Sequence, residues 1–89
     1  MKIKKGFAKR DIAGSTVVVP VGDMTKEFNG MITLNNSASF FWDIFAKNDI
    51  SIEQAVKEVT DKYDVSAEKA KKDIEDFVNM LKDNNLLDE

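Results

Sequence analysis

The sequence predicts an α+β domain in which a three-stranded antiparallel sheet is followed by a bundle of three helices. The first third of the chain is rich in short apolar and β-branched runs, and these are separated by turns at Gly14 and Gly22. From residue 37 onward, apolar residues instead recur every three or four positions, the period of an amphipathic helix. The short connections between these segments favour one compact unit over residues 1–89.

The first two strands are expected at Gly6–Ile12 and Thr16–Val21, joined by the turn Ala13-Gly14-Ser15. The β-branched run Val17-Val18-Val19 suits a pleated surface. Pro20 has no N–H, so its strand must end there or lie at an edge of the sheet.

The third strand is expected at Phe28–Leu34 and is the strand that bears on function. Alternate side chains of a strand point to opposite faces. The more apolar set should face the helices, and it consists of Phe28, Gly30, Ile32 and Leu34. The other set should face solvent, and it consists of Asn29, Met31, Thr33 and Asn35. The segment Met31–Leu34 has a glycine before it and a strongly apolar helix after it. We expect it to be the unpaired edge of the sheet, beside an apolar groove, where a second chain can pair.

The first helix is expected over Ser37–Lys47, with Asn36 or Ser37 as its N-cap. It is apolar around most of its circumference, which is typical of a central helix or of one that offers a side to a partner. Core positions are predicted for Phe41, Trp42 and Phe45, and groove-bordering positions for Phe40 and Ile44.

Two further helices are expected at Ile52–Tyr63 and Ala67–Asn84. Ser51 with Gln54 three residues later predicts a capping box, and Ser66 is the expected cap of the last helix. Asn84-Asn85 predicts a left-handed helix exit, after which Leu86 and Leu87 fold back onto the core. The order of elements describes a winged-helix-like domain.

Composition argues against an enzyme or a metal protein. The chain has neither cysteine nor histidine, so disulfides, thiolate metal sites and the commonest general base are excluded. Its serines fall at turns, caps or a first helical turn and lack a residue that would activate them. We expect no catalytic residue, no metal and no cofactor. No apolar run is long enough for a membrane, so a cytoplasmic location is expected.

Charge argues against nucleic acid as the main partner. The first ten residues hold five basic residues and no acid, whereas the other 79 hold eight basic and sixteen acidic residues, a net of −8. An acidic body opposes the phosphate contacts on which nucleic-acid binding depends. The winged-helix-like order nevertheless keeps a DNA-binding regulator as the alternative function. A homodimer paired through the exposed strand is a third hypothesis.

Capture of an extended peptide requires more than strand pairing. About four backbone hydrogen bonds are worth roughly 0.5–1.5 kcal/mol each. The cost of association, about 4–15 kcal/mol, absorbs that gain. Apolar contacts beside the strand must therefore supply the remainder. The space between the third strand and the third helix is the expected place for them.

Several segments, in order, resemble the PqqD-like family. These are residues 28–35 (FNGMITLN) with Asn36-Ser37-Ala38 and residues 41–45 (FWDIF), residues 10–14 (RDIAG) with 17–22 (VVVPVG), and the pattern Asp73, Phe77-Val78, Leu81, Leu86-Leu87. The resemblance covers almost the whole chain. It implies a three-stranded sheet on a three-helix bundle that recognises the precursor peptides of ribosomally made natural products.

In that family the leader of the precursor peptide adds as a strand beside the third strand and lies against the third helix. The domain then presents the peptide to a modifying enzyme, often a radical SAM protein. Carried onto this chain, the resemblance implies a peptide-binding site on the third strand and the third helix, formed by Met31, Ile32, Thr33, Leu34, Lys71, Ile74, Glu75 and Val78. The two groove-bordering residues of the first helix, Phe40 and Ile44, complete the expected site. Residues 23–27 depart from the form typical of pyrroloquinoline quinone pathways, so the pathway stays open. The protein is expected to be a monomer or a strand-paired dimer.

Overall fold

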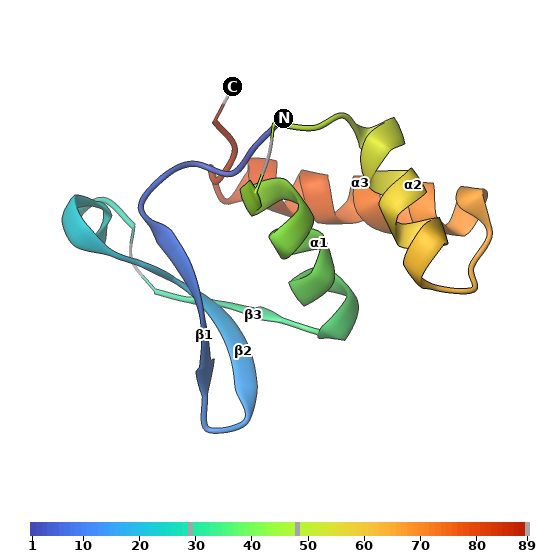
Figure 1. The fold of residues 1–89 in the computed structure, drawn as a ribbon. Helices are drawn as coiled ribbons and strands as arrows, with labels where there is room; N and C mark the ends of the chain where they lie inside the picture. The colour runs from blue at the N-terminus through green and yellow to red at the C-terminus, as the bar shows by residue number, and fades with distance from the viewer. Residues whose placement is uncertain (29, 48, 89) are drawn as a thin grey trace.

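The computed structural model describes residues 1–28, 30–47 and 49–88. Three antiparallel strands precede three helices, as the sequence predicts (Figure 1). The elements are β1 (Phe7–Ile12), β2 (Ser15–Pro20), the short 3₁₀ helix η1 (Gly22–Lys26), β3 (Ile32–Leu34), α1 (Asn36–Lys47), α2 (Ile52–Lys62) and α3 (Ala67–Asp83). The predicted α+β fold class is confirmed.

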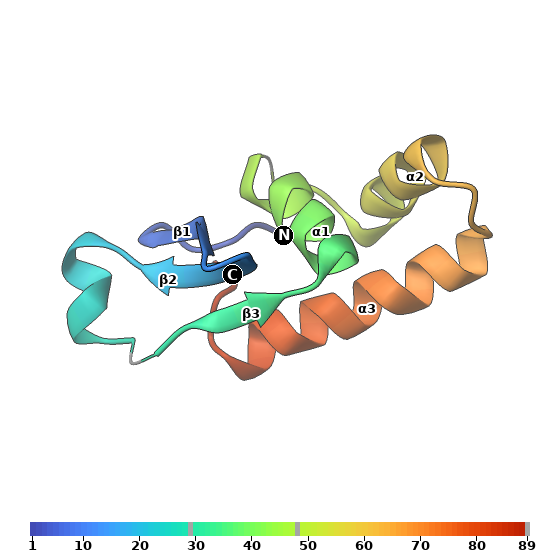
Figure 2. The same ribbon diagram turned by 90° about the horizontal axis from the view of Figure 1, so that it is seen from below.

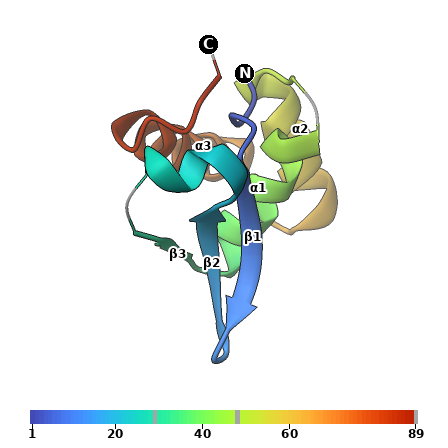
Figure 3. The ribbon, with the colours of Figure 1, turned by 90° about the vertical axis from the view of Figure 1, so that its left-hand side faces the viewer.

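The sheet has the order β1-β2-β3, so β1 and β3 are its two edges. β1 pairs with β2 over its whole length, whereas β3 pairs only with Thr16–Val18 of β2. The hairpin of β1 and β2 projects away from the helices, and its tip is the lowest point of the molecule in Figures 1 and 3.

The β1–β2 turn consists of Ala13 and Gly14, since Ile12 and Ser15 are directly opposed. Both turn residues have positive φ, 51° at Ala13 and 84° at Gly14. A type I′ turn requires this conformation at both of its central positions because its twist matches that of the strands. Glycine adopts it freely, but alanine is strained there.

The predicted third strand, Phe28–Leu34, was too long, because β3 begins only at Ile32. Upstream of it, Gly22–Lys26 form η1, which the sequence did not predict. The N–H of Phe28 donates to Met24 O at 2.9 Å and so belongs with η1 instead of with β3. Gly30, at φ +106°, then redirects the chain. The predicted alternation holds within β3, where Thr33 is exposed and Leu34 is buried. Asn29 lies outside the described residues.

The helices match their predicted bounds to within one residue at either end. Ser51 forms the predicted capping box with Gln54, and the Ser66 hydroxyl accepts from Lys69 N–H. The predicted cap of the first helix was wrong, since Oδ1 of Asn35 accepts from Ala38 N–H at 2.8 Å. The apolar helix thus begins one residue earlier, directly after β3.

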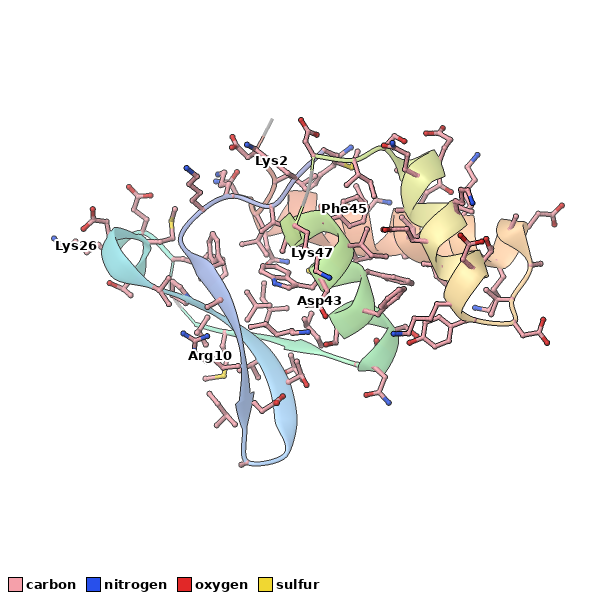
Figure 4. The ribbon with its side chains drawn as sticks, viewed as in Figure 1. Lys2, Arg10, Lys26, Asp43, Phe45 and Lys47 are labelled. Atoms are coloured by element: carbon pink, nitrogen blue, oxygen red, sulfur yellow. The ribbon has the colours of Figure 1, made fainter. Side chains whose placement is uncertain are left out.

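The core is formed by buried side chains from β2, β3 and all three helices. Phe41, Trp42 and Phe45 are buried, as predicted. Figure 4 shows Phe45 enclosed among the helices, whereas Asp43 and Lys47 lie on the outward side of α1.

The two ends of the chain are held together. Asn85, at φ 58°, makes the predicted left-handed exit from α3, and Leu86 and Leu87 are buried. The N–H of Lys4 then donates to Leu86 O at 2.8 Å, and Ile3 pairs with Leu87 as an isolated bridge. This contact anchors the end of α3 beside the start of the chain.

The strained turn leads to a prediction. Ala13→Asn creates the Asn-Gly pair favoured in type I′ turns and should stabilise the fold by about 0.5–1 kcal/mol. Thermal unfolding should show a midpoint higher by about 2–8 °C for a domain of this size. Gly14→Ala is the matched control and should lower the midpoint. An unchanged or lower midpoint for Ala13→Asn would show that Ala13 is not strained.

Candidate functional site

The free edge of β3 is the feature around which the site is built. One side of β3 pairs with β2, and no strand pairs with the other side within residues 1–28, 30–47 and 49–88. β3 and α3 lie alongside one another in the view from below (Figure 2). The edge therefore offers its unpaired N–H and C=O groups beside a helix.

A groove of about 520 Å³ lies between β3 and α3. Its floor is apolar and comes from all three neighbouring elements. The lining residues are Ile32, Thr33 and Leu34 of β3, Asn35, the α1 residues Ser37, Ala38 and Phe41, and the α3 residues Lys69, Asp73, Asp76, Phe77 and Met80.

Helical periodicity places the α3 residues of the groove on one face. Lys69, Asp73, Phe77 and Met80 are spaced by four, four and three positions, and Asp76 lies on the same face three positions after Asp73. Phe77 belongs both to this face and to the core, where it packs against Phe41 with ring centroids 5.7 Å apart. The floor of the groove is thus the outer surface of the core.

The rim of the groove along α3 carries two aspartates, each paired with a lysine one turn earlier. Lys69 Nζ lies 2.9 Å from Asp73 Oδ2, and Lys72 Nζ lies 3.1 Å from Asp76 Oδ2. The hydrogen bond to Asp76 raises the pKa of Lys72, its Coulomb attraction adds to this, and Asp73 contributes further. The two aspartates together therefore favour positive charge along this side of α3.

Only part of the predicted peptide site lies in this groove. Ile32, Thr33 and Leu34 line it, and Met31 adjoins them with a side chain that is 58% exposed. Phe40 and Ile44 face a separate hollow of about 360 Å³ between α1 and α2. The structure therefore does not bring the two α1 residues together with the β3 edge.

The predicted α3 residues occupy the opposite side of that helix from the groove. Ile74 and Val78 are buried in the core, Glu75 is exposed, and Lys71 lines a hollow between α2 and α3. The α3 residues that do face β3 were missed. Their sequence signal is weak, because Asp73 and Asp76 read as solvated positions and Phe77 as core.

Two kinds of site are not found in the part of the chain that the structure describes. Its aspartate and glutamate side chains form no group of three that could hold a metal ion. None of its helices is long and apolar enough to cross a membrane.

The fold and the groove define a small α+β domain with an open edge strand facing its third helix. The chain belongs to the coenzyme PQQ synthesis protein D (PqqD) family, whose model matches residues 15–87. This confirms the resemblance drawn from the sequence. No curated protein sequence matches the chain.

The fold is also similar to a solved structure described as "TbiB1 in Complex with the TbiA(beta) Leader Peptide". The two superpose with a TM-score of 0.74 over 99% of this chain and 95% of that chain, at 20% sequence identity. At this identity the likeness establishes the shared fold.

The aromatic floor leads to a prediction about stability. Phe77→Ala should cost about 3–5 kcal/mol, because it empties a buried site that contacts both Phe41 and Phe45. Phe40→Ala is the matched control and should cost only about 1–2 kcal/mol, since Phe40 is half-buried. Urea unfolding measures both. Equal losses would contradict the central position assigned to Phe77.

Proposed function

We propose that this protein binds the leader of a ribosomally made precursor peptide as an added strand at the free edge of β3. One observation carries the proposal: the unpaired edge of β3 and one face of α3 border the same groove. Strand addition with side-chain pockets beside the strand is an established way to recognise a peptide. Of the predicted binding residues, Ile32, Thr33 and Leu34 fit this geometry.

Membership of the PqqD family supports the proposal, as does a structural neighbour whose description names a bound leader peptide. The α3 contribution is revised from the sequence prediction. We propose that Asp73, Asp76, Phe77 and Met80 contact the peptide, in place of the residues on the far side of α3.

The energetics require both parts of the site. Pairing with a three-residue strand adds about three hydrogen bonds, worth roughly 0.5–1.5 kcal/mol each. Each 100 Å² of apolar surface buried in the groove would add about 2.5 kcal/mol. The cost of association, about 4–15 kcal/mol, is comparable to the sum of these two gains, so neither gain is sufficient alone. The groove, more than the edge, therefore decides which peptides bind.

We further propose that the protein itself catalyses nothing and presents the bound peptide to a separate modifying enzyme in the cytoplasm. The sequence has no histidine or cysteine to serve as base or nucleophile. A radical SAM enzyme is the partner that the family resemblance suggests. In a strand-paired homodimer a second copy would occupy the β3 edge, so peptide binding and self-association should exclude one another.

The DNA-binding alternative predicts a different surface on α3. Its groove-facing side carries two aspartates, and two of its four lysines, Lys69 and Lys72, are paired with them. Repulsion of phosphate should therefore prevent binding. A gel shift at low salt is expected to show no retarded duplex, and retardation that falls steeply with added salt would revive the alternative.

The direct test is calorimetric titration with the leader of a small precursor peptide encoded beside this gene. We expect micromolar or tighter binding that Thr33→Pro abolishes, because proline removes an N–H from the short edge strand and adds a ring beside it. Circular dichroism shows whether the variant keeps its fold. Undiminished binding to a folded Thr33→Pro protein would refute the edge site.

A second pair of variants tests the groove separately from the strand. Ala38→Phe fills the groove from α1 and should weaken leader binding at least about tenfold, the equivalent of 1.4 kcal/mol. Ala67→Phe is the matched control, because Ala67 is exposed and lines the hollow between α2 and α3. Equal effects of the two substitutions would argue against the groove.

A further inference from the structure

The dimensions of the groove limit the peptide segment that it can read. From Lys69 to Met80 the helix rises about 16 Å. An extended chain covers that distance with about five residues. Because alternate side chains of a strand point to opposite faces, only two or three of them enter the groove. Selection therefore depends on residues spaced two apart.

The groove offers these inward side chains an apolar floor and an acidic rim. Phe41, Phe77 and Met80 supply the floor, and Asp73 and Asp76 stand along the α3 side. A lysine or arginine suits such a surface, because its aliphatic stem lies on apolar atoms while its charged head reaches a carboxylate. An acidic side chain in the same place would meet two carboxylates.

The lysines already paired with the rim do not block this use. In both pairs, Lys69–Asp73 and Lys72–Asp76, the lysine precedes the aspartate by four residues. This is the weaker of the two orientations on a helix, and the lysine head groups are exposed to water. A cation held by strand pairing can therefore replace or share either lysine.

The charge of the whole protein acts in the same direction. The whole chain carries a net charge of −3, and residues 11–89 carry −8. Lys2 lies at the end of the molecule away from β3 (Figure 4), whereas Lys9 and Arg10 lie in β1, which β2 separates from β3. The long-range field at the groove thus favours a basic peptide.

We propose that the groove selects leaders in which a lysine or arginine lies two residues from an apolar residue, with its charged head at Asp73 and Asp76. This inference rests on the proposed function, and it names the class of leader that the site accepts. Asp73 and Asp76 are the residues that determine this specificity.

The experiment is selection from a phage-displayed library of random 12-residue peptides on the immobilised full chain. Four variants are selected in parallel: Thr33→Pro, Asp76→Lys, the double variant Asp73→Lys/Asp76→Lys, and Glu75→Lys. Glu75→Lys makes the same charge change on an exposed residue on the other side of α3 and is the matched control. Circular dichroism shows that each variant is folded.

Peptides that bind the unaltered protein but not Thr33→Pro should contain the apolar-x-basic spacing. Their lysine and arginine content should exceed the library frequency at least about twofold. Asp73→Lys/Asp76→Lys should shift the selection to aspartate and glutamate, whereas Glu75→Lys should not. For the best peptide, changing its basic residue to glutamate should weaken binding roughly fivefold, and Asp76→Lys should remove that loss.

Two outcomes are distinguishable as failures. Peptides that depend on Thr33 but show no basic preference, or a preference that Asp73→Lys/Asp76→Lys leaves unchanged, would overturn the inference and leave the proposed function standing. If no peptide is enriched over the Thr33→Pro control, the proposed function itself fails.

Discussion

The contact between Phe41 and Phe77 is the interaction on which the rest of the structure depends. Their ring centroids lie 5.7 Å apart, and Phe45 stacks on Phe77 from the next turn of α1 at 6.1 Å. This packing fixes α3 against α1. Because α1 begins two residues after β3 ends, it also fixes β3 relative to α3. The width of the groove is therefore set by core packing, and the same two rings form its floor.

The two edges of the sheet are not equivalent, although both are open. β1 carries Lys9, Arg10 and Asp11 in succession, and Lys9 bonds to Asp43 of α1. Charged side chains on an edge discourage pairing with another chain. β3 carries Ile32, Thr33 and Leu34, none of them charged, beside the groove. Its three-residue length limits indiscriminate pairing, so β3 suits a partner that also fits the groove.

The sequence predicts the elements well because their signals are local. The capping box at Ser51, the serine cap at Ser66 and the left-handed Asn85 each depend on residues within one turn. The predicted length of β3 was wrong, because the N–H of Phe28 bonds to Met24 of η1 and the strand begins only at Ile32. The α3 residues that line the groove could not be predicted for a different reason. A stripe through Ile74 and Val78 shows which side of a helix is buried, but which flank meets β3 is decided by how α3 crosses α1.

In the proposed complex, backbone pairing and side-chain selection act on different atoms of the peptide. Hydrogen bonds to the edge of β3 are the same for every sequence, so they hold a strand in register without identifying it. The floor and the Asp73–Asp76 rim contact only the side chains that point inward. The alternate side chains of an added strand would point away from the groove. Recognition of this kind would use one face of a leader and leave the other face accessible to a second protein.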